Sequence, residues 1–315
     1  MSAATNPSTL MTEVARLFFD RQRSKTEIAA ALGISRFRVA RLLAQSLEDG
    51  VVRIEYRDAP QADRAIAAAI EDAFGLSVCV VSSSSDTADL GRLAASLIDS
   101  MVGPEEVVGI AWGSTLAAVV AAMPVRRAEA IEVVQLAGSS VRFGRGEDPV
   151  ELARLLADCW GATAHPLFAP AFVDRPSLRT ALLAQPEAAA TVAMFPRLTL
   201  AVVGIGAIGP EVPDGSSLVR SGALAPDIVE DLIARGVVGD LLLHPVTEDG
   251  RFPADDLARR AVAIGVDGLR HVPRVVAVAG GAHKAAAIRG ALRTGIVGVL
   301  VTDVAAGRAI LEPAA

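Results

Sequence analysis

The chain has 315 residues, of which 52% are hydrophobic, and carries a formal net charge of −6. This length and composition predict a folded protein of about two domains and exclude a disordered chain. The N-terminus lacks a signal-peptide pattern, and no apolar run approaches the roughly 18 to 20 residues of a membrane helix. We therefore expect a cytoplasmic protein without a membrane partner. Two isolated cysteines and four scattered histidines lack metal-ligand spacing, so no metal site is expected.

The segment from Thr26 to Tyr56 has the pattern of a winged helix-turn-helix. A first helix is expected from about Leu10 to Arg21, and Gly33 suits the bend between the next two helices. Ser35 is a good N-cap for the last helix, since its hydroxyl can accept a hydrogen bond from a first-turn amide. Apolar residues at i, i+3 and i+4 give that helix one buried face: Val39, Leu42 and Leu43. The wing is expected from Val51 to Tyr56.

The opposite face of this last helix is polar and cationic. In a helix-turn-helix the N-terminal part of the second helix enters the major groove, where arginine pairs with guanine. We expect Arg38, Arg41 and Gln45 to face the bases, and Arg36 and Lys25 to contact the phosphate backbone. The expected DNA-binding set, including the capping serine, is Lys25, Ser35, Arg36, Arg38, Arg41 and Gln45.

Charge favours DNA contact at this end of the chain. Residues 1–57 contain nine Lys or Arg and six Asp or Glu, a net of +3, so residues 58–315 carry −9. Positive charge beside the expected reading helix favours local, salt-dependent binding to operator DNA. Two half-sites are the usual arrangement, so we expect a homodimer or homotetramer. The alternative is a helix pair that serves only as a scaffold.

A second domain is expected over residues 58–315, because apolar β-branched runs there alternate with alanine-rich helical patterns after a linking helix. This pattern predicts an α/β domain with a doubly wound parallel sheet, which binds ligands at the carboxyl ends of its strands. The expected strands are residues 76–81, 107–111, 131–136, 198–205, 275–279 and 296–301, and the expected helices are 90–101, 115–123, 150–159 and 225–234.

Two loops at strand ends favour an anion site. Gly113, Ser114 and Thr115 connect a strand directly to a helix, so exposed amides, hydroxyls and a helix dipole converge there. A weaker third loop, residues 137–140, follows another strand and could be an ordinary turn.

The second strong loop contains Gly280, Gly281 and Lys284, again at the start of a helix. The chain has only two lysines, Lys25 and Lys284, against 28 arginines. A lysine kept against this bias suits phosphate, which a compact ammonium binds as a point charge. The alternative is a solvated surface lysine.

Gly204, Gly206 and Gly209 match the spacing of a dinucleotide-binding motif, but the context fails. Pro210 and Pro213 follow at once, where the motif requires a helix to receive the pyrophosphate. We therefore expect no NAD, FAD or other cofactor, and a tight loop that lines a smaller ligand.

The order of motifs resembles the SorC/DeoR-type sugar-binding transcriptional regulators over nearly the whole chain. The motifs that carry this resemblance are Ile28-Ala29, Leu32 to Ser35, Gly109 to Leu116, Gln135-Leu136, Ala169 to Ala171, Gly204 to Gly206, Gly236 to Asp240, Ala279 to Lys284 and Thr302-Asp303. The resemblance implies a C-terminal domain similar to sugar-phosphate isomerases and deaminases, used as a sensor. It also implies a helix-turn-helix that controls a carbohydrate operon, and we expect a repressor.

By position in the family, a phosphorylated sugar or polyol would meet both anion loops, and its hydroxyls would meet Gln135, Asp240 and Asp303. Each of these three has a structural alternative: satisfying backbone, capping a turn and capping the final helix. The chain departs from the family pattern at Val304 and over residues 241–245. Some relatives hold their sugar as a Schiff base on lysine, which here is possible only at Lys284.

An enzyme is the rival hypothesis, namely a sugar-phosphate isomerase or deaminase with a helical N-terminal extension. Such chemistry needs a positioned general base and an opposing acid. The phosphate loops carry no tight acidic or histidine motif, so we expect no catalytic residues. A scaffold without ligand is a third possibility, which leaves the two anion loops unexplained.

Overall fold

The computed structural model describes residues 7–21, 23–52, 63–126, 130–140, 148–209, 212, 217–220, 222–253 and 255–312. The chain divides into two compact units, residues 1–58 and 59–315. The predicted boundary after residue 57 and the predicted wing, apart from Val51 and Val52, lie outside the described residues. Among the described residues, no helix is long and apolar enough to cross a membrane.

The described part of the first unit contains three helices around a small core. They are α1 (Pro7–Phe19), α2 (Lys25–Leu32) and α3 (Arg36–Glu48). Val14, Ile28 and Val39 come from the three helices in turn, and all are fully buried. Gly33 ends α2 in the left-handed conformation, with φ 63°, which glycine adopts without a steric penalty. Ser35 then caps α3, because its Oγ accepts a 3.2 Å hydrogen bond from the amide of Arg38.

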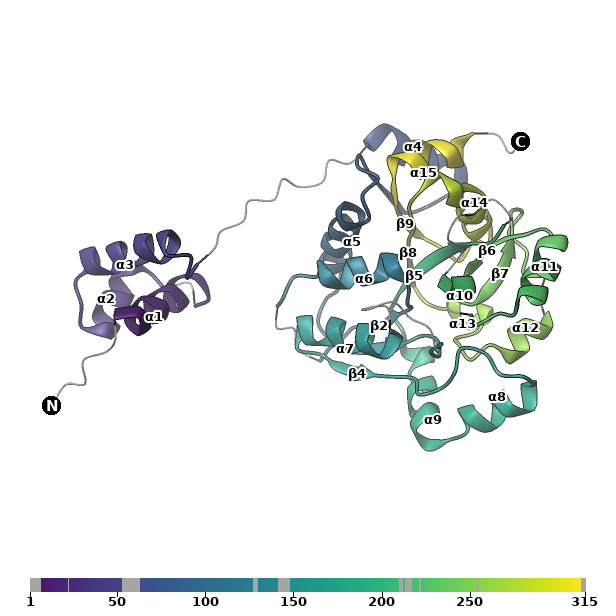
Figure 1. Ribbon diagram of the computed structural model, residues 1–315, viewed down its shortest axis with the longest axis horizontal. Helices are drawn as coiled ribbons and strands as arrows, with labels where there is room; N and C mark the ends of the chain where they lie inside the picture. The colour runs from purple at the N-terminus through teal and green to yellow at the C-terminus, as the bar shows by residue number, and fades with distance from the viewer. Residues whose placement is uncertain are drawn as a thin grey trace. The chain divides into compact units, whose positions relative to one another are not determined.

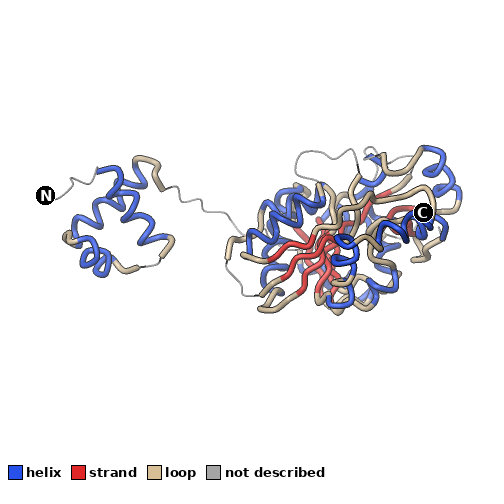
Figure 2. The backbone as a smooth tube through the Cα atoms, turned by 90° about the horizontal axis from the view of Figure 1, so that it is seen from below, coloured by secondary structure: helices blue, strands red, loops and turns tan. Residues whose placement is uncertain are grey.

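A parallel sheet forms the centre of the second unit (Figure 2). Its parallel strands lie in the order β1-β9-β8-β5-β2-β3-β4. The strands are β1 (Val78–Ser82), β2 (Val107–Ile110), β3 (Glu132–Gln135), β4 (Thr163–His165), β5 (Leu200–Ala207), β8 (Arg274–Val278) and β9 (Val299–Asp303). The central strands are apolar because helices cover both faces of the sheet.

The covering helices form two layers (Figure 1). One layer contains α5 (Thr87–Met101), α6 (Ser114–Ala121) and α7 (Pro149–Trp160); the other contains α4 (Arg64–Phe74), α14 (Ala285–Arg293) and α15 (Val304–Leu311). Gly91 lets α5 approach α6 closely, since a Cβ there would lie 2.7 Å from the backbone of Ala118. The predicted α/β class with a parallel sheet is confirmed by this arrangement.

An antiparallel hairpin extends the sheet and was not predicted. Strand β6 (Val237–Leu241) pairs with the end of β5 and with β7 (His244–Thr247). The last residues of β5 therefore belong to a strand, which corrects the prediction of a tight loop at Gly206, whereas Gly204 lies within the predicted strand 198–205. Gly239 on β6 pairs with Ala207 on β5, and a Cβ at Gly239 would clash with the neighbouring carbonyl of Gly206.

Shorter elements complete the second unit. They are α8 (Pro176–Leu183), α9 (Pro186–Val192), η1 (Phe195–Arg197), α10 (Ser217–Arg220), α11 (Pro226–Ala234), α12 (Asp255–Arg260), α13 (Val266–Arg270) and η2 (Ala282–Lys284). Of these, only α11 was predicted. Most of the others are too short to show a clear helical period in sequence.

The sheet reverses its direction of winding between β2 and β5. From β2 the chain proceeds to β3 on one side, whereas from β5 it proceeds, after the β6–β7 hairpin, to β8 on the other. In open α/β sheets, such a switch point opens a crevice at the carboxyl ends of the strands.

Candidate functional site

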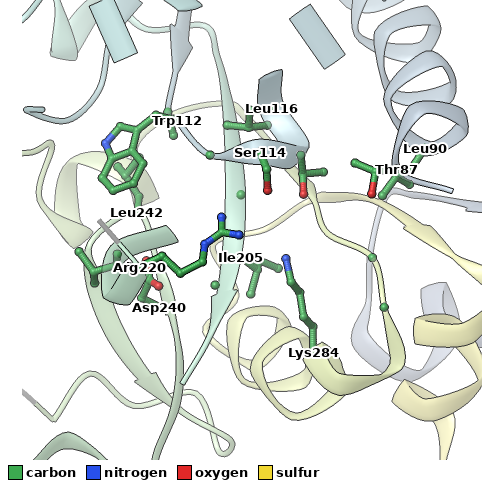
Figure 3. Close-up of a pocket in the computed structure, with 18 of the residues that line it drawn as sticks. Thr87, Leu90, Trp112, Ser114, Leu116, Ile205, Arg220, Asp240, Leu242 and Lys284 are labelled. Carbon is green, nitrogen blue, oxygen red and sulfur yellow. The ribbon is translucent and has the colours of Figure 1, made fainter. Parts of the chain in front are cut away.

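A pocket of about 310 Å³ opens at the carboxyl ends of the parallel strands, beside the switch point (Figure 3). Its walls come from segments that follow β1, β2, β3 and β8, from residues of β5, β6 and β9 themselves, and from α10 and the β6–β7 turn. The lining residues are Ser85, Thr87, Leu90, Ala111, Trp112, Gly113, Ser114, Thr115, Leu116, Ala137, Gly204, Ile205, Gly206, Leu218, Arg220, Asp240, Leu242, Leu243, Gly280, Gly281, His283, Lys284 and Asp303. Eight of the nine predicted effector residues are among them.

The segment after β2 brings the N-terminus of α6 to the pocket. Gly113 precedes the helix with φ 134° and supplies no side-chain cap. The first-turn amides of a helix have no carbonyl partner within it, and the helix dipole adds positive potential there. Ser114 directs its hydroxyl group toward the pocket (Figure 3), and Thr115, the next residue of α6, also lines the pocket. This end of α6 is therefore suited to bind an anion.

The segment after β8 forms the facing wall. The amide of Gly281 donates a 2.6 Å hydrogen bond to Oδ2 of Asp303, and Oδ1 of Asp303 accepts a 2.8 Å hydrogen bond from the amide of Ala306. Gly280 has to be glycine, because a Cβ there would clash with Oδ2 of Asp303 and lie 2.9 Å from Leu90. Asp303 thus fixes the loop after β8. It also caps α15, which is the structural role that the sequence offered as an alternative for this residue. In addition, Asp303 lines the pocket.

Lys284 extends its ammonium group toward the middle of the pocket (Figure 3). Burial lowers the pKa of Lys284 below its ordinary value. The carboxylate of Asp240 opposes this shift, Arg220 adds to it, and Asp303 opposes it. Since the net shift is downward, the nearby carboxylates do not fully compensate the cation for its burial. A bound anion would supply the missing compensation.

Asp240 lies at the opposite wall, on β6 beside a strained turn. Its side chain is buried, and Oδ2 accepts a 3.3 Å hydrogen bond from the amide of Leu243. Leu242 and Leu243 have φ 49° and 65°, in the left-handed region that side chains other than glycine rarely occupy. Both leucines line the pocket. Such strain is often found at ligand sites, where the surrounding structure holds it.

Arg220 was not predicted as a site residue. It lies on the short helix α10, and its guanidinium extends into the pocket near Asp240 and Lys284 (Figure 3). The sequence contains no signal that separates it from the other 27 arginines, because it follows no strand and begins no long helix. Ser85 and Thr87 also line the pocket without having been predicted, and His283 lines it as part of the predicted loop from Gly280 to Lys284.

Gln135 does not line the pocket, which corrects its predicted place among the sugar-binding residues. Its side chain is fully buried. Nε2 donates a 2.6 Å hydrogen bond to the carbonyl of Ala137, and Oε1 accepts a 2.9 Å hydrogen bond from the amide of Leu167. The amide side chain therefore satisfies backbone groups, which was the structural alternative.

The predicted DNA-binding residues lie on the first unit. Arg36, Arg38, Arg41 and Gln45 are all exposed on α3, opposite the buried face of that helix. The hydroxyl of Ser35 is used by the helix cap. The ammonium of Lys25 lies 5.8 Å from the centre of the Phe18 ring, so a cation–π contact holds it against α1.

A helix-turn-helix with an exposed cationic face, joined to an α/β unit with a pocket at its sheet edge, defines a ligand-responsive transcriptional regulator. Residues 59–312 match the family model described as a putative sugar-binding domain. The chain belongs to this family, the SorC/DeoR-type sugar-binding transcriptional regulators, which confirms the resemblance read from its motifs.

The similarity to proteins named as regulators extends over nearly the whole length of both chains. The erythritol catabolism regulatory protein of Brucella abortus is 28% identical over 96% of both chains. The deoxyribonucleoside regulator of Bacillus subtilis is 27% identical over 96% of this chain and 97% of its own. The crystal structure of the full-length sorbitol operon regulator of Klebsiella pneumoniae has a TM-score of 0.74 at 25% identity, and the match covers 96% of this chain and 98% of that one.

Proposed function

We propose that this regulator binds a phosphorylated sugar or polyol in the pocket and thereby controls a carbohydrate-utilisation operon. The observation that carries the proposal is the arrangement of Lys284 opposite the uncapped N-terminus of α6. A phosphate group carries a charge of about −1.5 to −2 at neutral pH and accepts several hydrogen bonds. The buried ammonium, the amides of Ser114 and Thr115, and the glycine loop after β8 together match that charge and geometry.

Some of the remaining pocket residues would contact the phosphate, and the others would contact the sugar or polyol. Arg220 supplies a second cation, for either the phosphate or an adjacent hydroxyl. Asp240 and Asp303 offer carboxylate oxygens to sugar hydroxyl groups. Trp112 and Leu242 supply the apolar surface against which a carbon chain can pack. Three relatives of this chain are named after erythritol, deoxyribonucleosides and sorbitol. The phosphorylated derivatives of these compounds are therefore the first candidates for the effector.

The output of the regulator is operator binding by α3. The exposed Arg38, Arg41 and Gln45 would face bases in the major groove, with Arg36 and Lys25 on the phosphates. A homodimer or homotetramer would place two such helices on two half-sites. We propose a repressor in which effector binding changes how protomers pack, and so lowers operator affinity. A solved relative from Vibrio fischeri, 28% identical, is described as the putative sugar-binding domain of a transcriptional repressor.

The effector is bound and not turned over, in this proposal. Isomerase or deaminase chemistry needs a side chain positioned to move a proton, such as a carboxylate or a histidine. Asp303 uses both oxygens for backbone amides, and Asp240 uses one oxygen for the turn at Leu243. These contacts favour a structural and binding role for both carboxylates.

A thermal-shift screen tests the effector class. The full-length protein is heated with paired compounds, each sugar or polyol beside its phosphate ester. At 100 times its dissociation constant, a ligand adds about 2.7 kcal/mol of stability, equivalent to about 5 °C or more for a unit of this size. We expect at least one phosphate ester to give such a shift and its unphosphorylated partner to give none. Equal shifts for both partners would refute phosphate recognition.

A further inference from the structure

Among the described residues, Phe37 is the most exposed large hydrophobic residue, with 89% of its surface accessible to solvent. It is the second residue of α3 and takes no part in the core around Val14 and Val39. A phenyl ring left in water gives up the stabilisation that burial would provide. The ring therefore adds nothing to the packing of its own unit, although it stands at the end of α3 that enters the groove in a helix-turn-helix.

The surroundings of Phe37 restrict what can cover it. Arg36 and Arg38 flank it, and Arg41 lies one helical turn along the same face. All three arginines are exposed, and none forms an ion pair within the described part of the chain. A partner here has to be anionic and yet present an apolar group between its charges. A second copy of this face would bring two arginine clusters together, which electrostatic repulsion disfavours.

The major groove of DNA has this combination of properties. Its phosphates are anionic, and the C5-methyl group of thymine is the apolar group that its base edges present. We propose that Phe37 packs against the methyl group of a thymine, so that it determines operator sequence in addition to the arginines. One helical turn is about 5.4 Å long and one base pair about 3.4 Å, so Phe37 and Arg41 reach positions one or two base pairs apart. The inference rests on the proposed DNA binding by α3, and it specifies a thymine within two base pairs of the guanine read by Arg41.

Uracil tests the proposal, because it differs from thymine only by lacking this methyl group. The probe is a duplex that the full-length wild-type protein selects from a random-sequence pool. Each thymine is replaced by uracil in turn, and the dissociation constant is measured at fixed salt. Burial of one methyl-sized group is worth about 0.8 kcal/mol, so replacement of the contacted thymine should weaken binding about fourfold.

The variants assign that effect to Phe37. Phe37→Ala should weaken binding to the thymine duplex and remove the difference between thymine and uracil. Phe37→Leu should keep part of the difference. Val125→Ala is the matched control, since Val125 is 85% exposed but lies in the other unit, and it should retain the full difference. Because the ring is outside the core, circular dichroism and melting temperature should not change in Phe37→Ala.

The remaining outcomes distinguish this inference from the proposed function. If no duplex is selected, DNA binding itself is refuted and the inference fails with it. If duplexes bind but uracil has the same effect on wild type and Phe37→Ala, the methyl contact is refuted while DNA binding stands. If Phe37→Ala changes the oligomeric state and leaves the thymine-to-uracil ratio intact, the ring covers a second copy of the chain and the inference is wrong.

Discussion

Replacement of Lys284 by methionine should separate effector binding from folding. Methionine keeps the length of the side chain and removes the charge. A hydrogen bond to a charged group contributes about 1.5–3 kcal/mol, so affinity for the phosphate ester should fall roughly 10- to 150-fold. Burial already holds the pKa of Lys284 below its ordinary 10.5 despite the nearby carboxylates. The folded protein without ligand should therefore be as stable as the wild type or more stable.

The lowered pKa of Lys284 also determines how the stability of the folded protein depends on pH. Because the pKa of Lys284 is lowered in the folded state, the unfolded chain binds more protons, and stability rises as pH increases toward 10.5. Lys284→Met should remove that rise. Melting curves across alkaline pH and calorimetric titration with the phosphate ester measure both effects. Lys25→Met is the matched control, since it removes the other lysine and should leave effector affinity unchanged. Wild-type effector affinity in Lys284→Met would refute the role of this ammonium.

Three further changes test the DNA face, the phosphate loop and the buried histidine. Arg38→Ala should cost about 1–3 kcal/mol on a selected duplex and relax the base preference at one position; uniform weakening on every sequence would instead make Arg38 a phosphate contact. Gly280→Ala should abolish effector binding because the new methyl clashes with the side chain of Asp303, whereas Gly298→Ala, with its nearest contact at 3.8 Å, should not, as titration of both variants would show. Burial lowers the pKa of His244 below its ordinary 6.5, so stability should fall as pH drops below about 6.5. The melting temperature of His244→Gln should depend less on pH in this range than that of the wild type. An unchanged pH dependence would show that His244 does not cause the loss of stability.

The sequence predicts the parallel strands well because helices bury both faces of the sheet. Strands β2, β5, β8 and β9 appear as apolar runs, and their bounds agree with the structure within a few residues. The antiparallel β6–β7 hairpin was missed for a physical reason. Its turn places Leu242 and Leu243 at positive φ, where sequence analysis looks for glycine or asparagine.

The site was predictable where it follows directly from a strand. Ser114 and Lys284 come at the starts of helices that follow buried strands, so topology brings them to one edge of the sheet. Arg220 reaches the same pocket from a four-residue helix, and neither periodicity nor spacing reveals it. Gln135 failed as a prediction because its side chain satisfies the backbone at Ala137 and Leu167, which no sequence pattern specifies.

In the proposed mechanism the pocket and the DNA-binding helix are coupled, and one titration tests this coupling most directly. The affinity of full-length protein for the phosphate ester found in the thermal screen is measured alone and with saturating selected duplex. Linkage requires that DNA and effector weaken each other's binding by the same factor, typically about 5- to 150-fold. We predict a weaker effector affinity in the presence of DNA, by the factor that the effector imposes on DNA binding. Equal effector affinity with and without the duplex would contradict the account.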